Sequence, residues 1–515
     1  MKNKYIYLIW FIAFLPIMIL RDFTPNNELR YLSIVDEAIS NGNIFTFTNQ
    51  GEIYADKPPL HFWLMMIGKL LLGEHRMWYY SLLSFIPSLI IVRTMINWVR
   101  SEYSINEPSA ILMLITSILF SGVTLVVRMD MMMNMFIILS LYTFYKMYQK
   151  KGSKGDEWLF PVYLFLALFS KGPLGLLIPL ISTSIFLLYN KRMNEFMKYW
   201  GWKSLMVILT CCIIWFVGAY FEGGKEYINN LLIHQTVGRG VDSFHHKEPF
   251  YYYAISIWYS LTPWSLLAIG LFITAIIKKR INNTLEEFFS VIIISSFVML
   301  SLISSKLAIY SLPIIPFLIF MTIIIFDKFN IQNRWIKLSI ALPASILAFA
   351  LPSILYISKI EEMQFLNNWI IYSGAGVLTI TALLCFYLLY HKRDTYLAIN
   401  TLAIGILMAV FIIGWSLPQL NDELGWRNMC EKAKEVSQEH MIDDYLVYQI
   451  SRAENMDVYL GKDIIEVSRE EILKEQPEKR LLMLQIKDMK NDLQLSAVIS
   501  NKKTFLIGKH AIVIF

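Results

Sequence analysis

Long apolar blocks recur along this chain of 515 residues and constrain its fold more than any other feature. Most blocks hold roughly 18 to 25 residues, the helix length that crosses a hydrocarbon layer about 30 Å thick. Hydrophobic residues make up 56% of the chain and charged residues 17%, which is too apolar for one water-soluble core. We therefore predict an all-α protein that crosses a membrane many times.

Short clusters of lysine and arginine separate the apolar blocks and indicate their orientation. Placing every cluster in the cytoplasm predicts a cytoplasmic N-terminus and about thirteen crossings by the positive-inside rule. The net charge of +6 then reflects topology, and no nucleic-acid partner is expected. The predicted crossings are residues 5–20, 77–98, 107–126, 132–149, 157–170, 173–190, 203–221, 253–277, 287–303, 308–326, 336–357, 368–390 and 396–416.

The polar C-terminal part follows an odd number of crossings and is therefore expected outside the cytoplasm. We expect residues 1–417 to form the transmembrane domain and residues 418–515 to form a small α/β domain. This part alternates charged stretches with short β-rich stretches. Its β-rich stretches are Tyr445–Gln449, Leu481–Ile486, Thr504–Ile507 and Ala511–Phe515.

The first outer loop, residues 21–76, is predicted to hold two helices at the membrane interface. Thr24 and Pro25 are typical of a helix start and Gly42 of a helix stop. The segment 58–73 is apolar but too short to cross, so we interpret it as an interfacial or re-entrant helix. The first helix has an apolar stripe that predicts a position on the membrane surface, formed by Leu29, Leu32, Val35 and Ile39.

Charged residues of this loop are candidates for a phosphate site. Glu28 and Arg30 lie at a helix start, where the helix dipole favours an anion and an arginine extends that preference to a phosphate. Asp56 and Lys57 precede a diproline, which would hold Lys57 at the level of a lipid headgroup. The alternatives are a solvated helix start and a lysine that only extends its ammonium group to the membrane surface.

Further charged residues fall at other outer turns. Asp130, next to Arg128, is either half of an ion pair that ties the loop or a catalytic carboxylate in a polar cavity. Lys171 lies at the turn of a helical hairpin, and Lys306 and Tyr310 lie at another outer corner. Several cations at one membrane surface suit an anion such as a lipid phosphate. Each lysine taken singly could equally be an ordinary helix-end residue.

Adjacent histidines in the loop 222–250 raise the question of a metal. His245 and His246 could bind zinc together with Asp56 or Glu28, although adjacent histidines are weak evidence for a metal site. A divalent metal such as zinc near the donor site is thus one option, and the pattern requires no cofactor.

Six motifs, taken in order, resemble those of one enzyme family. They are Glu28-x-Arg30-Tyr31, Tyr54-x-Asp56-Lys57-Pro58-Pro59-Leu60, Arg128-x-Asp130, Lys171-Gly172-Pro173, His246-Lys247-x-Pro249-Phe250-Tyr251-Tyr252 and Ser305-Lys306-Leu307-x-x-Tyr310-x-Leu312-Pro313. The set is similar to that of the C-type polyprenyl-phosphate-dependent glycosyltransferases of bacteria. It most resembles the lipid A aminoarabinose transferases, which are relatives of the protein O-mannosyltransferases.

The resemblance implies a bacterial inner-membrane protein with a catalytic cavity and a C-terminal domain on the periplasmic side. It implies that Asp130 is one of two cavity carboxylates. The family's other carboxylate precedes the glutamate of the first motif, and that position here is Asn27. Either Glu28 is the catalytic base, or the acceptor is a phosphate that needs no base. The residues assigned to the donor phosphate are Arg30, Tyr54, Lys57, Lys171 and Tyr310.

The function expected from this resemblance is sugar transfer at the outer leaflet. The sugar, aminoarabinose-like or mannose-like, would move from undecaprenyl phosphate to lipid A, another glycan or a protein, with inversion at the anomeric carbon. One alternative is a transporter or flippase of lipid-linked sugar, but polar residues gather at one surface and not at the midplane. Another is an O-antigen ligase or polymerase, which uses a diphosphate-linked donor.

Overall fold

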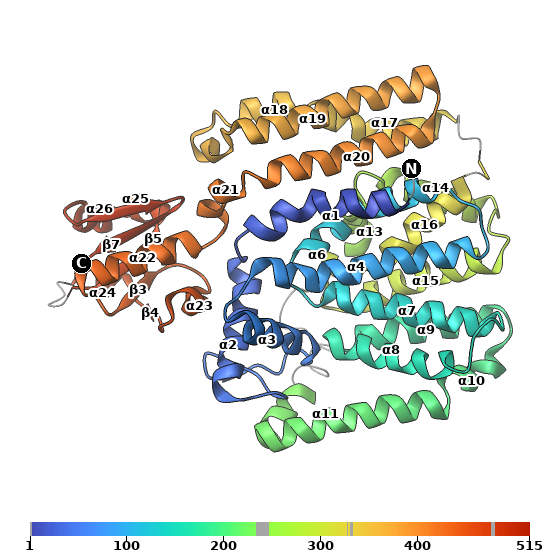
Figure 1. The fold of residues 1–515 in the computed structure, drawn as a ribbon, viewed down its shortest axis with the longest axis horizontal. Helices are drawn as coiled ribbons and strands as arrows, with labels where there is room; N and C mark the ends of the chain where they lie inside the picture. The colour runs from blue at the N-terminus through green and yellow to red at the C-terminus, as the bar shows by residue number, and fades with distance from the viewer. Residues whose placement is uncertain (1–2, 233–246, 327, 330–332, 475–478) are drawn as a thin grey trace.

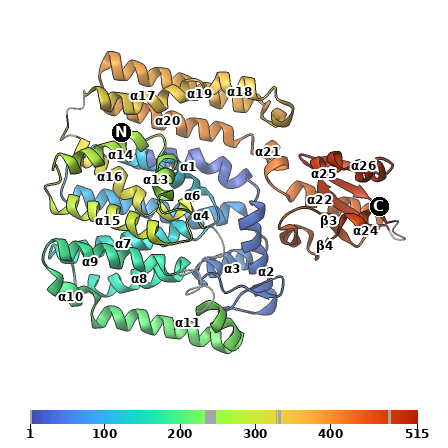
Figure 2. The ribbon, with the colours of Figure 1, turned by 180° about the vertical axis from the view of Figure 1, so that it is seen from behind.

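A helical bundle with a small α/β unit at one end makes up the protein (Figure 1). The computed structural model describes residues 3–232, 247–326, 328–329, 333–474 and 479–515. The N-terminus lies at the end of the bundle far from the α/β unit, and the C-terminus lies in that unit. The view from behind in Figure 2 shows the same arrangement.

Every apolar block of the sequence contains helix in the structure. The longer helices of the bundle are α1 (Asn3–Leu20), α4 (Met77–Arg100), α5 (Glu107–Ile115), α6 (Ile118–Leu125), α7 (Asp130–Tyr148), α8 (Asp156–Lys171), α9 (Leu174–Tyr189), α11 (Trp202–Asn229), α13 (Tyr252–Ser260), α14 (Ser265–Ile277), α15 (Thr284–Leu302), α16 (Ile314–Phe326), α17 (Arg334–Ala348), α18 (Ala350–Ile357), α19 (Trp369–Phe386) and α20 (Thr395–Gly414). Between α9 and α11 lies the short helix α10 (Phe196–Trp200).

Several of these helices are long and apolar enough to cross a bilayer. Seven in the described part of the chain meet that criterion by length and composition, or eight if α5 and α6 form one broken span. These two helices are bent by 66° at their junction, where one continuous crossing had been predicted. The protein is an integral membrane protein, and the total of thirteen crossings stays a prediction.

Burial differs across the bundle as expected for helices in lipid. In α4 and α15, 61% of the apolar 18-residue stretch is buried inside the protein. For the corresponding stretch of α11, 17% is buried. Helix α11 lies at one edge of the bundle and α17 to α19 lie at the opposite edge, in both Figure 1 and Figure 2. Large apolar side chains on these edge helices are exposed, for example Phe221 on α11 and Ile346 on α17. Lipid tails would cover such surfaces.

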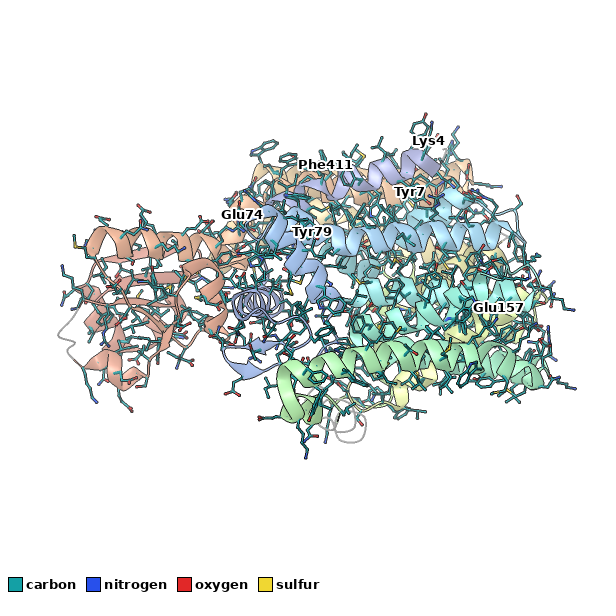
Figure 3. The ribbon with its side chains drawn as sticks, turned by 60° about the horizontal axis from the view of Figure 1, so that its bottom comes forward. Lys4, Tyr7, Glu74, Tyr79, Glu157 and Phe411 are labelled. Atoms are coloured by element: carbon teal, nitrogen blue, oxygen red, sulfur yellow. The ribbon has the colours of Figure 1, made fainter. Side chains whose placement is uncertain are left out.

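The two ends of the bundle differ in what they carry. Figure 3 shows Lys4 and Glu157 at the end far from the α/β unit, and Glu74 and Tyr79 at the end near it. The first loop lies at this second end and contains α2 (Arg30–Asn41), the strands β1 (Thr48–Asn49) and β2 (Glu52–Ile53), and α3 (Leu60–Leu72). The antiparallel pair β1 and β2 closes the hairpin between the two helices.

The helix ends in this loop agree with the sequence signals. Thr24 and Pro25 begin one turn of π-helix that continues into α2, and Gly42 ends α2 with φ 72°. Gly73 ends α3 with φ 75°. Both glycines adopt the left-handed conformation that favours a residue without a Cβ atom.

The apolar stripe of α2 differs from its prediction. Leu29, Leu32 and Val35 are fully buried against protein. Helix α2 packs against α3 on one side and against the C-terminal helix α23 (Asp457–Leu460) on another. The stripe therefore faces protein, where the sequence predicted that it would lie on the membrane surface.

The C-terminal unit is built on a five-stranded mixed sheet with the order β4-β3-β5-β7-β6. Strand β3 pairs in parallel with β4 and β5, while β7 pairs antiparallel with β5 and β6. The helix α21 (Leu417–Leu424) leads into this unit. The remaining elements are α22 (Arg427–His440), β3 (Tyr445–Tyr448), β4 (Ile465–Glu466), α24 (Arg469–Leu473), β5 (Leu481–Gln485), α25 (Ile486–Asn491), α26 (Leu493–Ser500), β6 (Thr504–Ile507) and β7 (His510–Ile514).

Buried polar contacts join the C-terminal unit to the first loop. Asp22, at the end of α1, accepts hydrogen bonds from the backbone N–H groups of Trp426 and Arg427 and from the Tyr459 hydroxyl. Ser33 of α2 donates to Asp457 at 2.8 Å. These contacts fix α2, and the loop that follows it, against the C-terminal unit.

Candidate active site

The centre of the candidate site is a buried ion triplet. The Asp130 carboxylate, at the start of α7, is fully buried. It forms ion pairs with Lys171 at the end of α8 and with Arg128, whose Nε lies 3.1 Å from Oδ2. The short 127–131 turn and the α8–α9 turn thus meet at one point. The ion pair predicted between Arg128 and Asp130 is present, and Lys171 joins it.

Tyr310 borders this triplet from the corner before α16. The Lys171 ammonium lies 4.4 Å from the centre of the Tyr310 ring, a cation–π distance. Lys306, at the same corner, is buried and donates to the Glu248 carbonyl at 2.9 Å. Lys247 also pairs with Ser305 as an isolated β-bridge. These contacts hold the chain that returns from the 222–250 loop against the corner that carries Tyr310.

The second half of the site comes from the first loop. The Lys57 ammonium lies 3.1 Å from the Asp56 carboxylate, which also accepts a hydrogen bond from the Tyr54 hydroxyl at 3.3 Å. The Arg30 guanidinium lies 5.6 Å from the Tyr54 ring centre and 5.8 Å from the Tyr31 ring centre. The rings therefore hold Arg30 in place through cation–π contacts, and no described carboxylate pairs with it.

Tyr31 lies between the two halves. Burial raises the pKa of its phenol, and the next largest influences come from Arg128, Asp130, Arg30 and Asp56. Its hydroxyl points at the sulfur of Met129, beside Asp130. Lys57 is within electrostatic reach of Lys171. The charged groups of both halves therefore form one cluster, which we call the site cluster.

The site cluster has an excess of positive charge. Within the described residues it contains four cations and two carboxylates, namely Arg30, Lys57, Arg128 and Lys171 with Asp56 and Asp130. Buried charges are expensive to keep without compensation. A dianionic group such as a phosphate monoester would balance the excess.

Glu28 lies in a different environment from the site cluster. Its buried carboxylate accepts two hydrogen bonds from Arg21, at 2.6 and 2.8 Å, and one each from the backbone N–H groups of Thr24 and Val127, both at 2.7 Å. Burial opposes ionisation, but Arg21 and these hydrogen bonds together hold the pKa of Glu28 below its usual value. The carboxylate thus ties the end of α1 to the start of α2 and to the 127–131 turn.

The metal site considered from the sequence would be formed by Asp56 and two adjacent histidines. His245 and His246 lie outside the described residues, as do His234, Arg239 and Asp242. Among the residues that the structure describes, no group of three or more His, Cys, Asp or Glu side chains is placed to hold a metal ion. Asp56 itself contacts Lys57 and Tyr54.

Sequence reasoning overlooked two polar residues near the site. His61 follows the Pro58-Pro59-Leu60 motif by one position and is fully buried in the first turn of α3. Asn134 lies one turn after Asp130 on α7 and is also fully buried. The available signal was a polar residue at a position where the surrounding pattern is apolar, which marks a functional candidate in a membrane protein.

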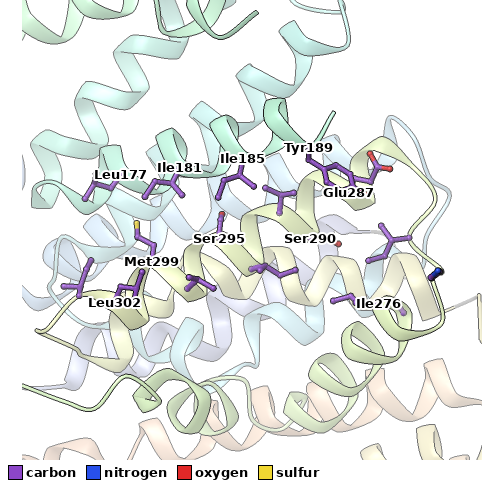
Figure 4. A pocket seen from close by; sticks show the side chains of 17 residues that line it. Leu177, Ile181, Ile185, Tyr189, Ile276, Glu287, Ser290, Ser295, Met299 and Leu302 are labelled. Atoms are coloured by element: carbon purple, nitrogen blue, oxygen red, sulfur yellow. The ribbon is translucent and has the colours of Figure 1, made fainter. Parts of the chain in front are cut away.

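An apolar cavity of about 1020 Å³ lies between α9, α14 and α15 (Figure 4). Leu177 and Leu302 line one end of it, and Tyr189 and Glu287 line the other, as Figure 4 shows. Leu177 is close in sequence to Lys171, and Leu302 to Lys306. The first end of the cavity is therefore the one directed toward the site cluster.

Comparison with known proteins gives consistent matches. Residues 56–216 match the family described as dolichyl-phosphate-mannose-protein mannosyltransferase. Over 436 residues the chain is 21% identical to undecaprenyl phosphate-alpha-4-amino-4-deoxy-L-arabinose arabinosyl transferase 1 of Pseudomonas fluorescens, covering 82% of this chain and 75% of that enzyme. The crystal structure of ArnT from Cupriavidus metallidurans bound to undecaprenyl phosphate aligns with a TM-score of 0.77 and 16% identity, covering 100% of this chain and 98% of that one.

The protein is a glycosyltransferase, and it is similar to enzymes that use polyprenyl-phosphate donors. The resemblance predicted from the six motifs is thereby confirmed. At 16% identity the structural match shows that the fold is shared. A protein of Aquifex aeolicus described as uncharacterized is 26% identical over 312 residues, which is 60% of each chain. The alignment spans 60% of the length of that Aquifex aeolicus protein, and the alignment with the arabinosyl transferase 2 of Pseudomonas fluorescens spans 57% of that enzyme.

Proposed function

We propose that the enzyme transfers a sugar from undecaprenyl phosphate to an acceptor at the periplasmic surface of the bacterial inner membrane. The observation that carries the proposal is the excess positive charge of the site cluster, in a bundle that also holds a large apolar cavity between α9, α14 and α15. A polyprenyl-phosphate sugar offers both matching parts, an anionic phosphate and a long apolar tail. The relatives named as undecaprenyl phosphate aminoarabinose transferases support the same class of donor.

The donor phosphate would lie among Arg30, Lys57, Lys171 and Tyr310, with Tyr54 supporting Arg30. Lys57 is separated from α3 only by Pro58 and Pro59, and the N-terminus of this helix adds a favourable dipole. The prenyl tail would follow the apolar cavity between α9 and α15, from Leu302 and Leu177 into the membrane. Tail and phosphate then take adjacent places in one continuous site.

In the proposed reaction an acceptor oxygen attacks the anomeric carbon of the sugar. The bond between this carbon and the phosphate oxygen breaks, and its electron pair leaves with undecaprenyl phosphate. The cations stabilise the charge that develops on the leaving phosphate, and their placement before the reaction lowers the barrier. Attack opposite the leaving group inverts the configuration at the anomeric carbon.

The acceptor in this proposal carries a phosphate group whose oxygen is already ionised. Glu28 accepts four hydrogen bonds, and Asp130 is paired with two cations. Asn27 stands where the resembling family has a second carboxylate. A phosphate oxygen attacks without losing a proton to a base, whereas a sugar or serine hydroxyl requires one. A phosphorylated glycolipid such as lipid A fits this requirement, and aminoarabinose is the proposed sugar.

The proposed topology puts this chemistry outside the cytoplasm. The N-terminus would lie in the cytoplasm, residues 1–417 would form the transmembrane domain, and residues 418–515 would form a periplasmic domain. Support comes from the positive-inside distribution and from the opposite ends of the bundle at which Lys4 and Glu74 lie (Figure 3). The first outer loop, residues 21–76, then faces the periplasm together with the site cluster.

Replacement of Lys57 by alanine in the purified enzyme, with donor lipid supplied in vesicles, tests the donor site. The variant should lose transfer by at least about a hundredfold, because one of the cations on the leaving phosphate is gone. Lys69→Ala is the matched control, since Lys69 lies in the same loop but pairs with Asp36 at 3.3 Å. Normal turnover in Lys57→Ala would refute the assignment.

The acceptor is tested separately by mass spectrometry of lipid A and glycoproteins from a deletion strain. The proposal expects one sugar residue to disappear from a lipid A phosphate in that strain. Loss of sugar from a protein, with unchanged lipid A, would overturn the assignment of the acceptor while leaving the donor site standing.

A further inference from the structure

His61 is a buried polar residue whose state the fold itself does not explain. It lies in the first turn of α3, four positions after Lys57, and its side chain is fully buried. In the described part of the protein neither ring nitrogen has a hydrogen-bond partner. A buried polar group left without a partner destabilises a fold, and most native structures avoid it.

The same loop satisfies its other histidine completely. His75, just after the end of α3, bonds through Nε2 to Asp36 at 2.8 Å and through Nδ1 to Tyr80 at 2.7 Å. The two histidines therefore differ in partners, although they lie in one loop. The difference suggests that the partners of His61 come from a bound molecule.

The surroundings of His61 belong to the site. Its ring meets the Tyr31 ring edge-on, with 6.5 Å between the centres. Burial lowers the pKa of His61 to about 4, with smaller influences from Asp130 and Arg128. At neutral pH the imidazole is uncharged and presents one N–H donor and one nitrogen acceptor.

A second residue of the site is in the same state. Asn134 lies one turn after Asp130 on α7, fully buried, and neither atom of its amide group has a described partner. Both residues thus add uncharged hydrogen-bonding groups close to Asp130, while the site cluster supplies charge. Phosphate is recognised by charge, whereas a sugar is recognised by uncharged donors and acceptors at fixed positions.

We propose that His61 binds the sugar of the donor lipid, with one ring nitrogen donating to and the other accepting from hydroxyl or amino groups of that sugar. The assignment rests on the proposed function and adds a residue that determines specificity for the sugar. Lys57 and Arg30 then recognise the phosphate that every polyprenyl-phosphate donor shares, and His61 recognises the part that differs among donors.

The test compares His61→Phe with the wild-type enzyme in two measurements. The first is kcat/KM for transfer from the sugar-loaded donor, which should fall by about tenfold to a hundredfold because hydrogen bonds to the sugar are lost. The second is inhibition by undecaprenyl phosphate without sugar, which should stay within about twofold because the phosphate contacts remain. The thermal midpoint should stay equal or rise, because an unpartnered polar group has been replaced by an apolar one.

A purely structural role for His61 predicts other results. Transfer within about twofold of wild type would overturn the proposal, and so would equal weakening of transfer and of undecaprenyl phosphate binding. His61→Leu is measured in parallel so that the comparison survives poor folding of the phenylalanine variant. His75→Phe is the control and should lower the thermal midpoint, because it leaves Asp36 and Tyr80 without their partner.

The failure of this inference can be separated from the failure of the proposed function. If Lys57→Ala abolishes transfer while His61→Phe is normal, the donor site stands and only the sugar contact is wrong. If Lys57→Ala is itself normal, the proposed function fails whatever His61 does.

Discussion

At the scale of single residues, the two carboxylates that the sequence suggested for catalysis differ in the groups with which they pair. Asp130 lies inside the site cluster and pairs with Lys171 and Arg128. Glu28 instead accepts its hydrogen bonds from Arg21 and from two backbone N–H groups. Sequence spacing could name both residues, but it could not tell which one faces the site.

Glu28→Gln tests whether Glu28 is structural. The amide cannot accept all four hydrogen bonds, so the thermal midpoint should fall, by an amount equivalent to about 2 to 4 kcal/mol. Transfer per folded molecule should fall less than tenfold, whereas loss of a general base lowers it by about 10² to 10⁴. A large loss of turnover at unchanged stability would show that Glu28 is the base.

The same residue predicts a dependence of stability on pH. The pKa of Glu28 in the folded protein lies below its ordinary value of 4.5. The contribution of Glu28 to the free energy of unfolding is therefore complete above about pH 4.5. It is lost as the pH falls through the lowered pKa that Glu28 has in the folded protein. Wild-type protein should lose its advantage over Glu28→Gln across this acid range in thermal unfolding measurements. A constant difference between the two proteins from pH 7 down to pH 3 would contradict the assignment.

Asp130 and Lys171 should be energetically coupled. Asp130→Asn leaves two cations without their carboxylate, and Lys171→Met leaves Asp130 with Arg128 alone. The double variant should therefore be more stable than the sum of the single losses predicts, by at least about 1 kcal/mol. Additive effects in a double-mutant cycle of unfolding would show that the pair is not coupled.

At the scale of elements, α11 fixes the chain that leads to Tyr54 and Lys57. The Glu222 carboxylate of α11 accepts hydrogen bonds from the backbone N–H groups of residues 44 to 46. The Tyr227 hydroxyl reaches the Tyr54 carbonyl at 3.4 Å. An edge helix with little protein packing thus positions part of the site.

Glu222→Leu should release this clamp. Amide exchange of the peptide that covers residues 43–50 should become faster in hydrogen–deuterium exchange, because three N–H groups lose their acceptor. Glu226→Leu is the matched control, because Glu226 is exposed and lies four positions further along the chain, beyond the break in α11 at Gly224. Unchanged exchange in Glu222→Leu would mean that other contacts hold the loop.

Local sequence signals predicted where helices end better than they predicted whether lipid or protein covers a helix face. Thr24-Pro25 and Gly42 mark the helix ends correctly, because capping depends on nearby backbone geometry. The stripe on α2 was recognised as apolar, but periodicity cannot tell whether lipid or protein covers it. The 66° bend between α5 and α6 was missed for a related reason, since hydropathy is the same on both sides of the break.

At the scale of the whole molecule, the ordered motifs carried more information than any one of them. Residues 30, 57, 130, 171 and 310 are far apart in the sequence, yet the fold brings them to one end of the bundle. The enzyme class was predictable from that order. The role proposed for His61 was not predictable, because it depends on a buried imidazole that has no hydrogen-bond partner among the described residues.

The apolar cavity offers a test of the donor tail. Ile294 lines it from α15, so Ile294→Trp should narrow it. KM for the full-length donor should then rise about tenfold, whereas KM for a donor with a short prenyl tail should change little, because the short tail does not reach the obstruction. Equal effects on both donors in a steady-state assay would place the tail elsewhere.

The central claim is that the protein breaks the bond between a sugar and a polyprenyl monophosphate. The most direct measurement gives the purified enzyme, in acceptor-containing vesicles, either a monophosphate-linked or a diphosphate-linked sugar and follows the lipid products by mass spectrometry. We predict that only the monophosphate donor is consumed, releasing one undecaprenyl phosphate for each sugar transferred. Consumption of the diphosphate donor, or movement of intact donor across the bilayer without cleavage, would contradict the account.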